Sequence, residues 1–436
     1  MNEKAGDQEY RAYGYRWVVL LAFGLVLCVQ AFLWISFAPI ESSVEKVFGV
    51  GSGLVRLLAL VGPLMFVFLG SLAGDMADKR GFKFTVSLGA VVISLAGIFR
   101  AVVPHLSISG KSQYWIILVC QAVIGGGAVF ILVNMSKMPI KWFLEEARAT
   151  AIGITTVFFY LGSAVGIPLV TAIAGIPEGT TDLALMTNGV NRVLNVFAII
   201  MAASTALFIA LARENPPTPS GPVPEEAKLG VFVALKRFLA APTFQALALV
   251  SLIGYGAFVG LTVTMEKIIG YHGFSSSFAS FVASALIVGG IIGAGILPGL
   301  SEKIGLRKPF LILAALVTVP MGFLIGFVGV KALNLAGAFL LGFFLLSALP
   351  VTFTIVSEME EIGPVFAGSA VGTLMALGNI GSLIIPLAME ALKRGGAENP
   401  DYRVSLLMLF ALAILGMLVV IWRVKETGPR AKGAKG

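Results

Sequence analysis

Polar and aromatic side chains recur near the middle of long apolar stretches in this 436-residue chain. A polar group inside a bilayer is costly, so each such residue is a candidate for function. Gln30 and Trp34 are four residues apart and therefore share one helix face. With four others in comparable positions they form our predicted substrate-binding set, which is Gln30, Trp34, Gln121, Tyr160, Tyr255 and Asn379.

The chemistry of this set suits a small organic solute. Ring faces attract organic cations, and amides supply hydrogen bonds without charge. Other interpretations stay open for single members. Trp34 fits an aromatic belt at the membrane surface, the amides of Gln121 and Asn379 fit hydrogen bonds between helices, and the two tyrosines fit packing.

Titratable groups are missing from the centres of the apolar stretches. Neither Asp nor Glu occurs there, and His105 and His272 fall in the connections between stretches. A proton-coupled carrier usually needs a titratable group near its solute, and Glu266 near the end of one stretch is the nearest candidate. We therefore expect transport without proton coupling, no enzymatic activity, no catalytic residues, no metal site and no cofactor.

Two short charged segments form an internal repeat. GDMADKRGFK (74–83) and PGLSEKIGLRK (298–308) align with an offset of 224 residues, which pairs Asp78 with Glu302. Glycine permits positive φ in a tight turn, the acid can face a neighbouring helix N-terminus, and the basic residues can anchor at an anionic leaflet. We predict that these segments act as conformational-switch loops, through Gly74, Asp78, Gly81, Lys83, Glu302, Gly305 and Arg307.

The elements that position these residues follow from composition. Apolar residues make up 58% of the chain and charged residues 12%, which argues against a soluble enzyme or a nucleic-acid binder. A spanning helix needs about 20 apolar residues. Twelve runs qualify, at roughly 16–40, 53–74, 84–104, 114–136, 149–174, 190–212, 243–269, 278–300, 308–330, 333–355, 365–391 and 404–423.

A proline-rich segment divides these runs into two sets of six. We expect one helical bundle over 1–212, a linker over 213–241 and a second bundle with a basic tail over 242–436. The net charge is +8, and placing both termini in the cytoplasm puts 21 of the 31 Lys and Arg residues on that side. This distribution predicts a multi-pass protein of the plasma membrane with both termini cytoplasmic.

The first charged segment resembles the signature of the major facilitator superfamily, G-x-x-x-D-x-x-G-x-[KR], through Gly74, Asp78, Gly81 and Lys83. The second copy departs from it, with Pro298 for the first glycine and Glu302 for the aspartate. The resemblance implies an all-α fold of two six-helix bundles that rock about a central cavity. It also implies that Asp78 latches the outward-facing state.

A narrower resemblance is to the haem and choline transporter family named for the feline leukaemia virus subgroup C receptor. It rests on residues 16–35, on VFIL (129–132), KWF (141–143), LGSAVG (161–166) and LPV (349–351). It implies a choline-type site in which Trp34 and Asn379 take the positions of the family's tryptophan and amide. The chain departs from this site at Tyr160 and at Val259, although Tyr255 lies one turn before Val259.

Together these features predict a transporter that moves a small organic solute across the bilayer by alternating access. The mechanism would be facilitative or secondary active, and the solute an organic cation or amphiphile. The alternative is an organic-anion carrier or exchanger that uses Arg56 and Arg100, which otherwise fit snorkelling at outer helix ends. Lys137 fits either a gate or an anchor. We expect a monomer whose partners are the solute and the lipid bilayer, with no nucleic acid.

Overall fold

The computed structural model describes residues 12–177, 180–218, 231–362, 364–395 and 400–430. Within these ranges twelve helical segments are long and apolar enough to cross a membrane, which confirms the prediction from the apolar runs. They form two bundles of six spans. The all-α fold follows from the same physics, because a helix satisfies its backbone hydrogen bonds internally where no water can.

The first bundle contains the spans that precede the linker. The segment α2 (Glu41–Phe48) is a short helix outside the spans, between the first and second of them. The spans are α1 (Arg16–Ile35), α3 (Ser52–Arg80), α4 (Phe82–Val102), α5 (Gly110–Leu132) continued by α6 (Lys137–Trp142), α7 (Arg148–Ala174) and α8 (Leu183–Leu211).

The second bundle repeats this arrangement. Its spans are α10 (Pro242–Tyr271), α11 (Ser276–Ile304), α12 (Lys308–Phe327), α13 (Lys331–Leu345) continued by α14 (Ala348–Glu358), α15 (Ala367–Ala391) and α16 (Arg403–Arg423). The short helix α9 (Val231–Ala240) precedes α10, so the C-terminal part of the predicted linker is helical. Residues 219–230 of that linker lie outside the described residues.

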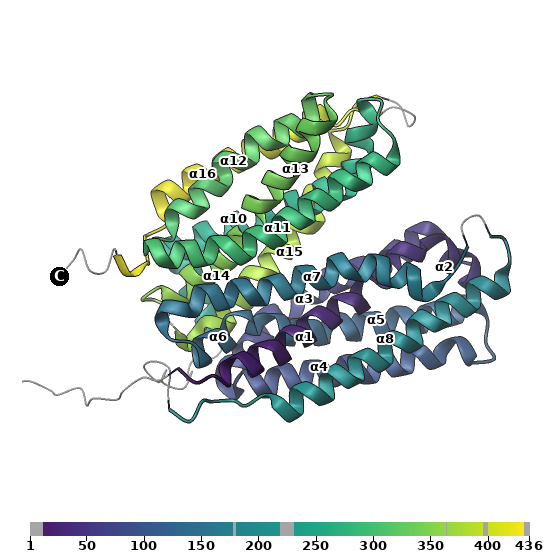
Figure 1. The fold of residues 1–436 in the computed structure, drawn as a ribbon, viewed down its shortest axis with the longest axis horizontal. Helices are drawn as coiled ribbons and strands as arrows, with labels where there is room; N and C mark the ends of the chain where they lie inside the picture. The colour runs from purple at the N-terminus through teal and green to yellow at the C-terminus, as the bar shows by residue number, and fades with distance from the viewer. Residues whose placement is uncertain (1–11, 178–179, 219–230, 363, 396–399, 431–436) are drawn as a thin grey trace, which may run out of the picture.

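The two bundles are inclined to each other. We call the end where α1 begins and α16 ends the terminus side, and the opposite end the α2 side. Figure 1 shows the bundles close together on the terminus side and diverging towards the α2 side. The pairs α3–α15 and α7–α11 make the main contacts between the bundles.

Two predicted boundaries differ from the structure. The second span continues past 74, so Gly74 and Asp78 lie on α3 itself rather than in a loop, and Glu302 likewise lies on α11. The turns are confined to Gly81 (φ 88°) and Gly305 (φ 72°), whose positive φ is the conformation expected for glycine there.

The fourth and tenth spans are each broken, although the sequence predicts single helices. The fourth passes through η3 (Val133–Met135) between α5 and α6. The tenth is interrupted at residues 346–347, between α13 and α14. In each case a proline, Pro139 or Pro350, is the third residue after the break. Because proline has no N–H, it cannot complete the helical ladder across the break.

Candidate functional site

A cavity of about 510 Å³ lies between the bundles, and all six residues of the predicted binding set line it. Its walls come from both bundles. The first bundle contributes α1, α3, α5 and α7, and the second contributes α10, α12, α15 and α16 together with the break between α13 and α14. That the tertiary structure brings these six residues together is an observation. That they bind a solute stays a prediction.

Trp34 and Gln30 face this cavity from α1. The indole Nε1 of Trp34 donates a hydrogen bond to the carbonyl oxygen of Ala59 on α3 at 3.0 Å. This bond holds the ring against α3 and places it in the cavity wall, not in a belt at the membrane surface. Gln30 is 2% exposed, and its Nε2 has no hydrogen-bond partner among the described residues. A buried amide donor without a partner beside a cavity can serve a solute acceptor.

Gln121 is held by a buried cation. Its Oε1 accepts from Nη1 of Arg100 at 2.6 Å, and its Nε2 lies 3.4 Å from the carbonyl oxygens of Leu33 and Trp34. The amide therefore connects α4, α5 and α1. This agrees with the other interpretation of Gln121, in which its amide forms hydrogen bonds between helices.

The structure contradicts both predictions for Arg100. Its side chain is 0% exposed, lies over the ring of Phe37 and does not line the cavity. It thus neither snorkels to the membrane surface nor faces a solute directly. The reason is local, because Gln121 and Ser36 supply acceptors inside the bundle. The side chains of Arg56 and Glu266 lie outside the described residues.

Tyr255 and Asn379 contribute the opposite wall. Tyr255 lies against Gly378, where any side chain would collide with its ring. Asn379 donates from Nδ2 to the carbonyl oxygen of Met375 in its own helix at 2.8 Å. Tyr160 crosses the interface, because its hydroxyl donates to the carbonyl oxygen of Leu346 in the other bundle at 3.3 Å.

The cavity is neutral and aromatic. Among the described lining residues none carries a charged side chain. Four further rings line it, those of Phe66, Phe159, Phe258 and Phe410, and none of them belongs to the predicted binding set. The chain has 31 phenylalanines, so nothing in the sequence distinguishes these four from rings that face lipid.

Asp78 joins the two bundles on the terminus side. Its fully buried carboxylate lies at the N-terminus of α15, in the other bundle. It accepts from the backbone N–H of Gly368 at 2.9 Å and of Ser369 at 2.8 Å, and it pairs with Nζ of Lys137 at 2.6 Å. Lys137 also donates to the carbonyl oxygen of Val365 in the other bundle at 2.8 Å.

Glu302 makes the related contact in the opposite direction. Its carboxylate accepts from the backbone N–H of Ala149 and the hydroxyl of Thr150, at the N-terminus of α7 in the first bundle. Each repeat acid thus reaches a helix N-terminus of the other bundle. A carboxylate there is stabilised by free N–H groups and by the helix dipole.

One basic residue of the repeat, Arg307, differs from the prediction that it anchors at the lipid surface. Arg307 is 1% exposed and forms an ion pair with Glu358 at 2.9 Å, so it does not anchor at the lipid surface. The backbone N–H of Lys83 donates to Glu214 at 2.7 Å, and that of Arg307 donates to Glu426 at 2.8 Å. The two glutamates were missed, although each follows the last span of its half.

Gly74 has a packing role within the interface. A Cβ at this position would collide with the backbone of Gly368 and Ser369. Gly70 and Gly372 meet in the same way one turn away. The absence of side chains lets α3 and α15 approach closely, so that Asp78 can reach the N–H groups of α15.

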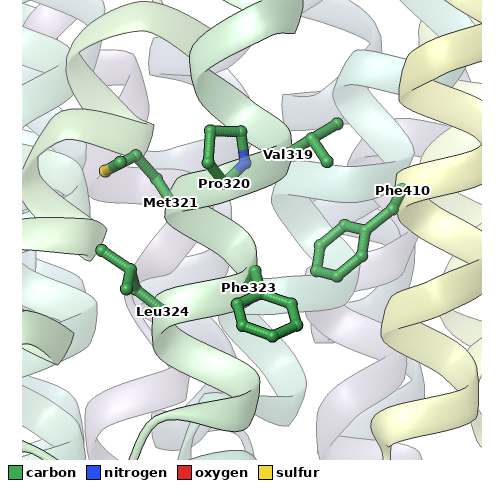
Figure 2. A pocket seen from close by; sticks show the side chains of 6 residues that line it. All are labelled: Val319, Pro320, Met321, Phe323, Leu324 and Phe410. Atoms are coloured by element: carbon green, nitrogen blue, oxygen red, sulfur yellow. The ribbon is translucent and has the colours of Figure 1, made fainter.

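A second pocket of about 430 Å³ lies between α12 and α16. Figure 2 shows Phe410 extending from α16 towards the face of α12 that carries Pro320 and Phe323. The pocket's six lining residues are all apolar. It offers no polar group for recognition, so we assign it no part in the site.

Two bundles of six spans around a shared cavity, closed at one end by interlocking acids, define a membrane transporter. The sequence profile described as Major Facilitator Superfamily matches residues 21–386. The chain belongs to this superfamily, whose members are transporters.

Known proteins with similar sequence or structure agree with this assignment. Solute carrier family 49 member A3 of Xenopus tropicalis is 26% identical, over 95% of this chain and 88% of its own. The choline/ethanolamine transporter FLVCR1 of Felis catus is 26% identical, over 86% of this chain and 68% of its own. The E. coli fucose:proton symporter has the same fold, with a TM-score of 0.73, 16% identity and coverage of 93% and 99%. The predicted resemblances to the superfamily and to the choline transporter family are therefore confirmed.

Proposed function

We propose that this transporter carries a small organic cation, of the size and polarity of choline, by alternating access. The observation that carries the proposal is the neutral cavity between the bundles. Trp34 lines it from the first bundle and Tyr255 from the second. A quaternary or protonated amine is attracted to ring faces without a carboxylate. The choline/ethanolamine transporter among the relatives supports the same class of solute.

We further propose that the terminus side faces the cytoplasm of a plasma-membrane protein. The excess of Lys and Arg on that side supports this orientation. With that orientation, Asp78 and Glu302 close the inward path, and the diverging bundles describe an outward-facing state (Figure 1). Release inward then requires both acids to leave their helix N-termini. In this movement, we propose, residues 1–212 and 242–436 rock as two bundles that the linker over 213–241 connects.

Uptake of radiolabelled choline into proteoliposomes tests the proposed solute. We expect saturable uptake, and we expect Trp34→Ala to reduce it about tenfold, which corresponds to ~1.4 kcal/mol of cation–π interaction in a desolvated site. Trp115→Ala is the matched control, since Trp115 is 53% exposed and does not line the cavity. Equal uptake by the Trp34→Ala variant and the wild type would reject the role of Trp34.

The coupling mode can be tested in the same vesicles. We expect an imposed pH gradient to leave uptake unchanged, because no described lining residue is an acid or a histidine. Uptake that a pH gradient drives, and that Glu266→Gln abolishes, would contradict this expectation. Inhibition of uptake by organic anions in place of cations would support the anion-carrier alternative.

A further inference from the structure

The break in the tenth span leaves a backbone carbonyl without its usual partner. In an uninterrupted helix the carbonyl oxygen of Leu346 would accept from the N–H of residue 350. Residue 350 is proline, which has no N–H. The hydroxyl of Ser347 donates to the carbonyl oxygens of Phe343 and Phe344, at 2.7 and 3.0 Å, so the side chain at the break serves those two acceptors and not Leu346.

The carbonyl of Leu346 instead accepts from the other bundle. Leu346 lines the cavity, and its oxygen receives the hydroxyl of Tyr160 at 3.3 Å. Hydrogen bonds between two oxygens are usually 2.7–2.8 Å long, so this contact is a weak one. A ligand with a better-placed donor can therefore replace the tyrosine.

The first bundle has the same kind of break, but its freed carbonyl does not belong to a residue of the cavity wall. Pro139 deprives the carbonyl of Met135 of its helical donor, and the hydroxyl of Thr155 donates to that oxygen at 3.2 Å. Met135 is 0% exposed and does not line the cavity, and Thr155 belongs to the same bundle. Of the two breaks, only the second thus has its freed carbonyl on a residue of the cavity wall, with a hydrogen-bond partner from the other bundle.

We propose that the carbonyl oxygen of Leu346 is a recognition site for an N–H donor on the cationic head of the solute, which displaces the hydroxyl of Tyr160. This inference rests on the proposed function and adds a preference within its solute class, for ammonium groups that keep at least one N–H over quaternary ones such as choline. A carbonyl at the C-terminal end of a helix carries partial negative charge, and unwound carbonyls near a membrane midplane can hold cations. None of the described lining residues supplies a carboxylate, so this oxygen is a natural acceptor.

The experiment compares two ligands that differ in one substituent on the nitrogen atom. Choline and N,N-dimethylethanolamine are both cations at neutral pH, but only the second has an N–H. Their dissociation constants would be measured on the purified full-length protein in nanodiscs, and the affinity of dimethylethanolamine relative to choline would be the readout. A change in the population of outward-facing protein alters both constants equally, so it cancels in this ratio.

Two variants should move the ratio in opposite directions. Pro350→Ala restores an N–H that occupies the carbonyl of Leu346, and we expect it to lower the ratio at least about fivefold, the equivalent of one neutral hydrogen bond. Tyr160→Phe removes the competing hydroxyl and should raise the ratio. Pro139→Ala is the matched control, since it restores the corresponding N–H away from the cavity and should leave the ratio unchanged.

The outcomes separate this inference from the proposed function. If both ligands bind and the ratio stays at the wild-type value in Pro350→Ala or in Tyr160→Phe, the inference is overturned while the cation site stands. If neither ligand binds the wild type, the proposed solute class is wrong and the inference falls with it. A fall of the ratio in Pro139→Ala as large as that in Pro350→Ala would also overturn it.

Discussion

Ser369 donates both its backbone N–H and its hydroxyl to the carboxylate of Asp78, at 2.8 and 2.5 Å, although the two residues are 291 positions apart. The contact joins α3 of one bundle to the start of α15 in the other. A buried acid that is neutralised by N–H groups and by Lys137 stabilises the closed terminus side. Any movement that opens this side must separate these partners.

We expect Asp78→Asn to shift the protein towards opening on the terminus side. Removal of one partner of a buried ion pair leaves an uncompensated charge, here that of Lys137. A tenfold change in the ratio of open to closed protein, about 1.4 kcal/mol, is a conservative expectation. Spin labels at Arg80→Cys and Lys303→Cys, one exposed site in each bundle with Cys28 and Cys120 replaced, would report a longer distance.

The control for this change is Asp75→Asn on the same helix. Asp75 pairs with Lys79 one turn away at 2.9 Å, within α3. Loss of this pair should leave the distance distribution unaltered. An Asp78→Asn protein whose distances match those of the wild type would show that the acid does not hold the closed state.

Close helix approach should be as important as the charge. We expect Gly372→Ala to weaken closure, because the added Cβ would collide with the carbonyl oxygen of Gly70 across the interface. The same pair of spin labels measures the effect. Gly254→Ala is the control, since a Cβ there meets no atom within 4 Å. Identical distances in both glycine variants would mean that α3 and α15 do not need this contact.

Arg100 and Gln121 should be strongly coupled in stability. We expect Arg100→Met and Gln121→Leu to be non-additive by about 1–3 kcal/mol, because either single change leaves a buried polar group without its partner. The double variant should be more stable than the sum of the single losses predicts. Unfolding free energies in mixed micelles for the four proteins give the coupling, and additive values would contradict it.

Glu426 should stabilise the start of α12. Its carboxylate accepts from the backbone N–H groups of Arg307 and Lys308, at 2.8 and 3.0 Å. We expect Glu426→Gln to lower the unfolding free energy by about 0.3–2 kcal/mol, the range for a charge at a helix N-terminus. Glu360→Gln, at an exposed position, is the control. Equal melting temperatures for the two variants would argue against the cap.

The sequence predicted the spans and the two glycine turns of the repeat because their signals are local. Twelve apolar runs give twelve spans, and Gly81 and Gly305 end their helices where the repeat placed turns. The six residues of the predicted binding set could be selected because polar residues inside a bilayer are conspicuous, and all six line one cavity. The rings of Phe66 and Phe258 could not be found in this way, since they look like any other apolar residue.

What the sequence alone determined is the helical class of the fold, the number of spans and the polar positions within them. The tertiary structure decided which of those positions share a cavity, and it buried Arg100 behind Gln121. It also determined that Asp78 contacts the start of α15, and that the bundles meet on the terminus side. The physical reason is that helix faces towards lipid and towards protein are both apolar, so no amphipathic pattern orients a membrane span. Only the packed bundles fix its rotation.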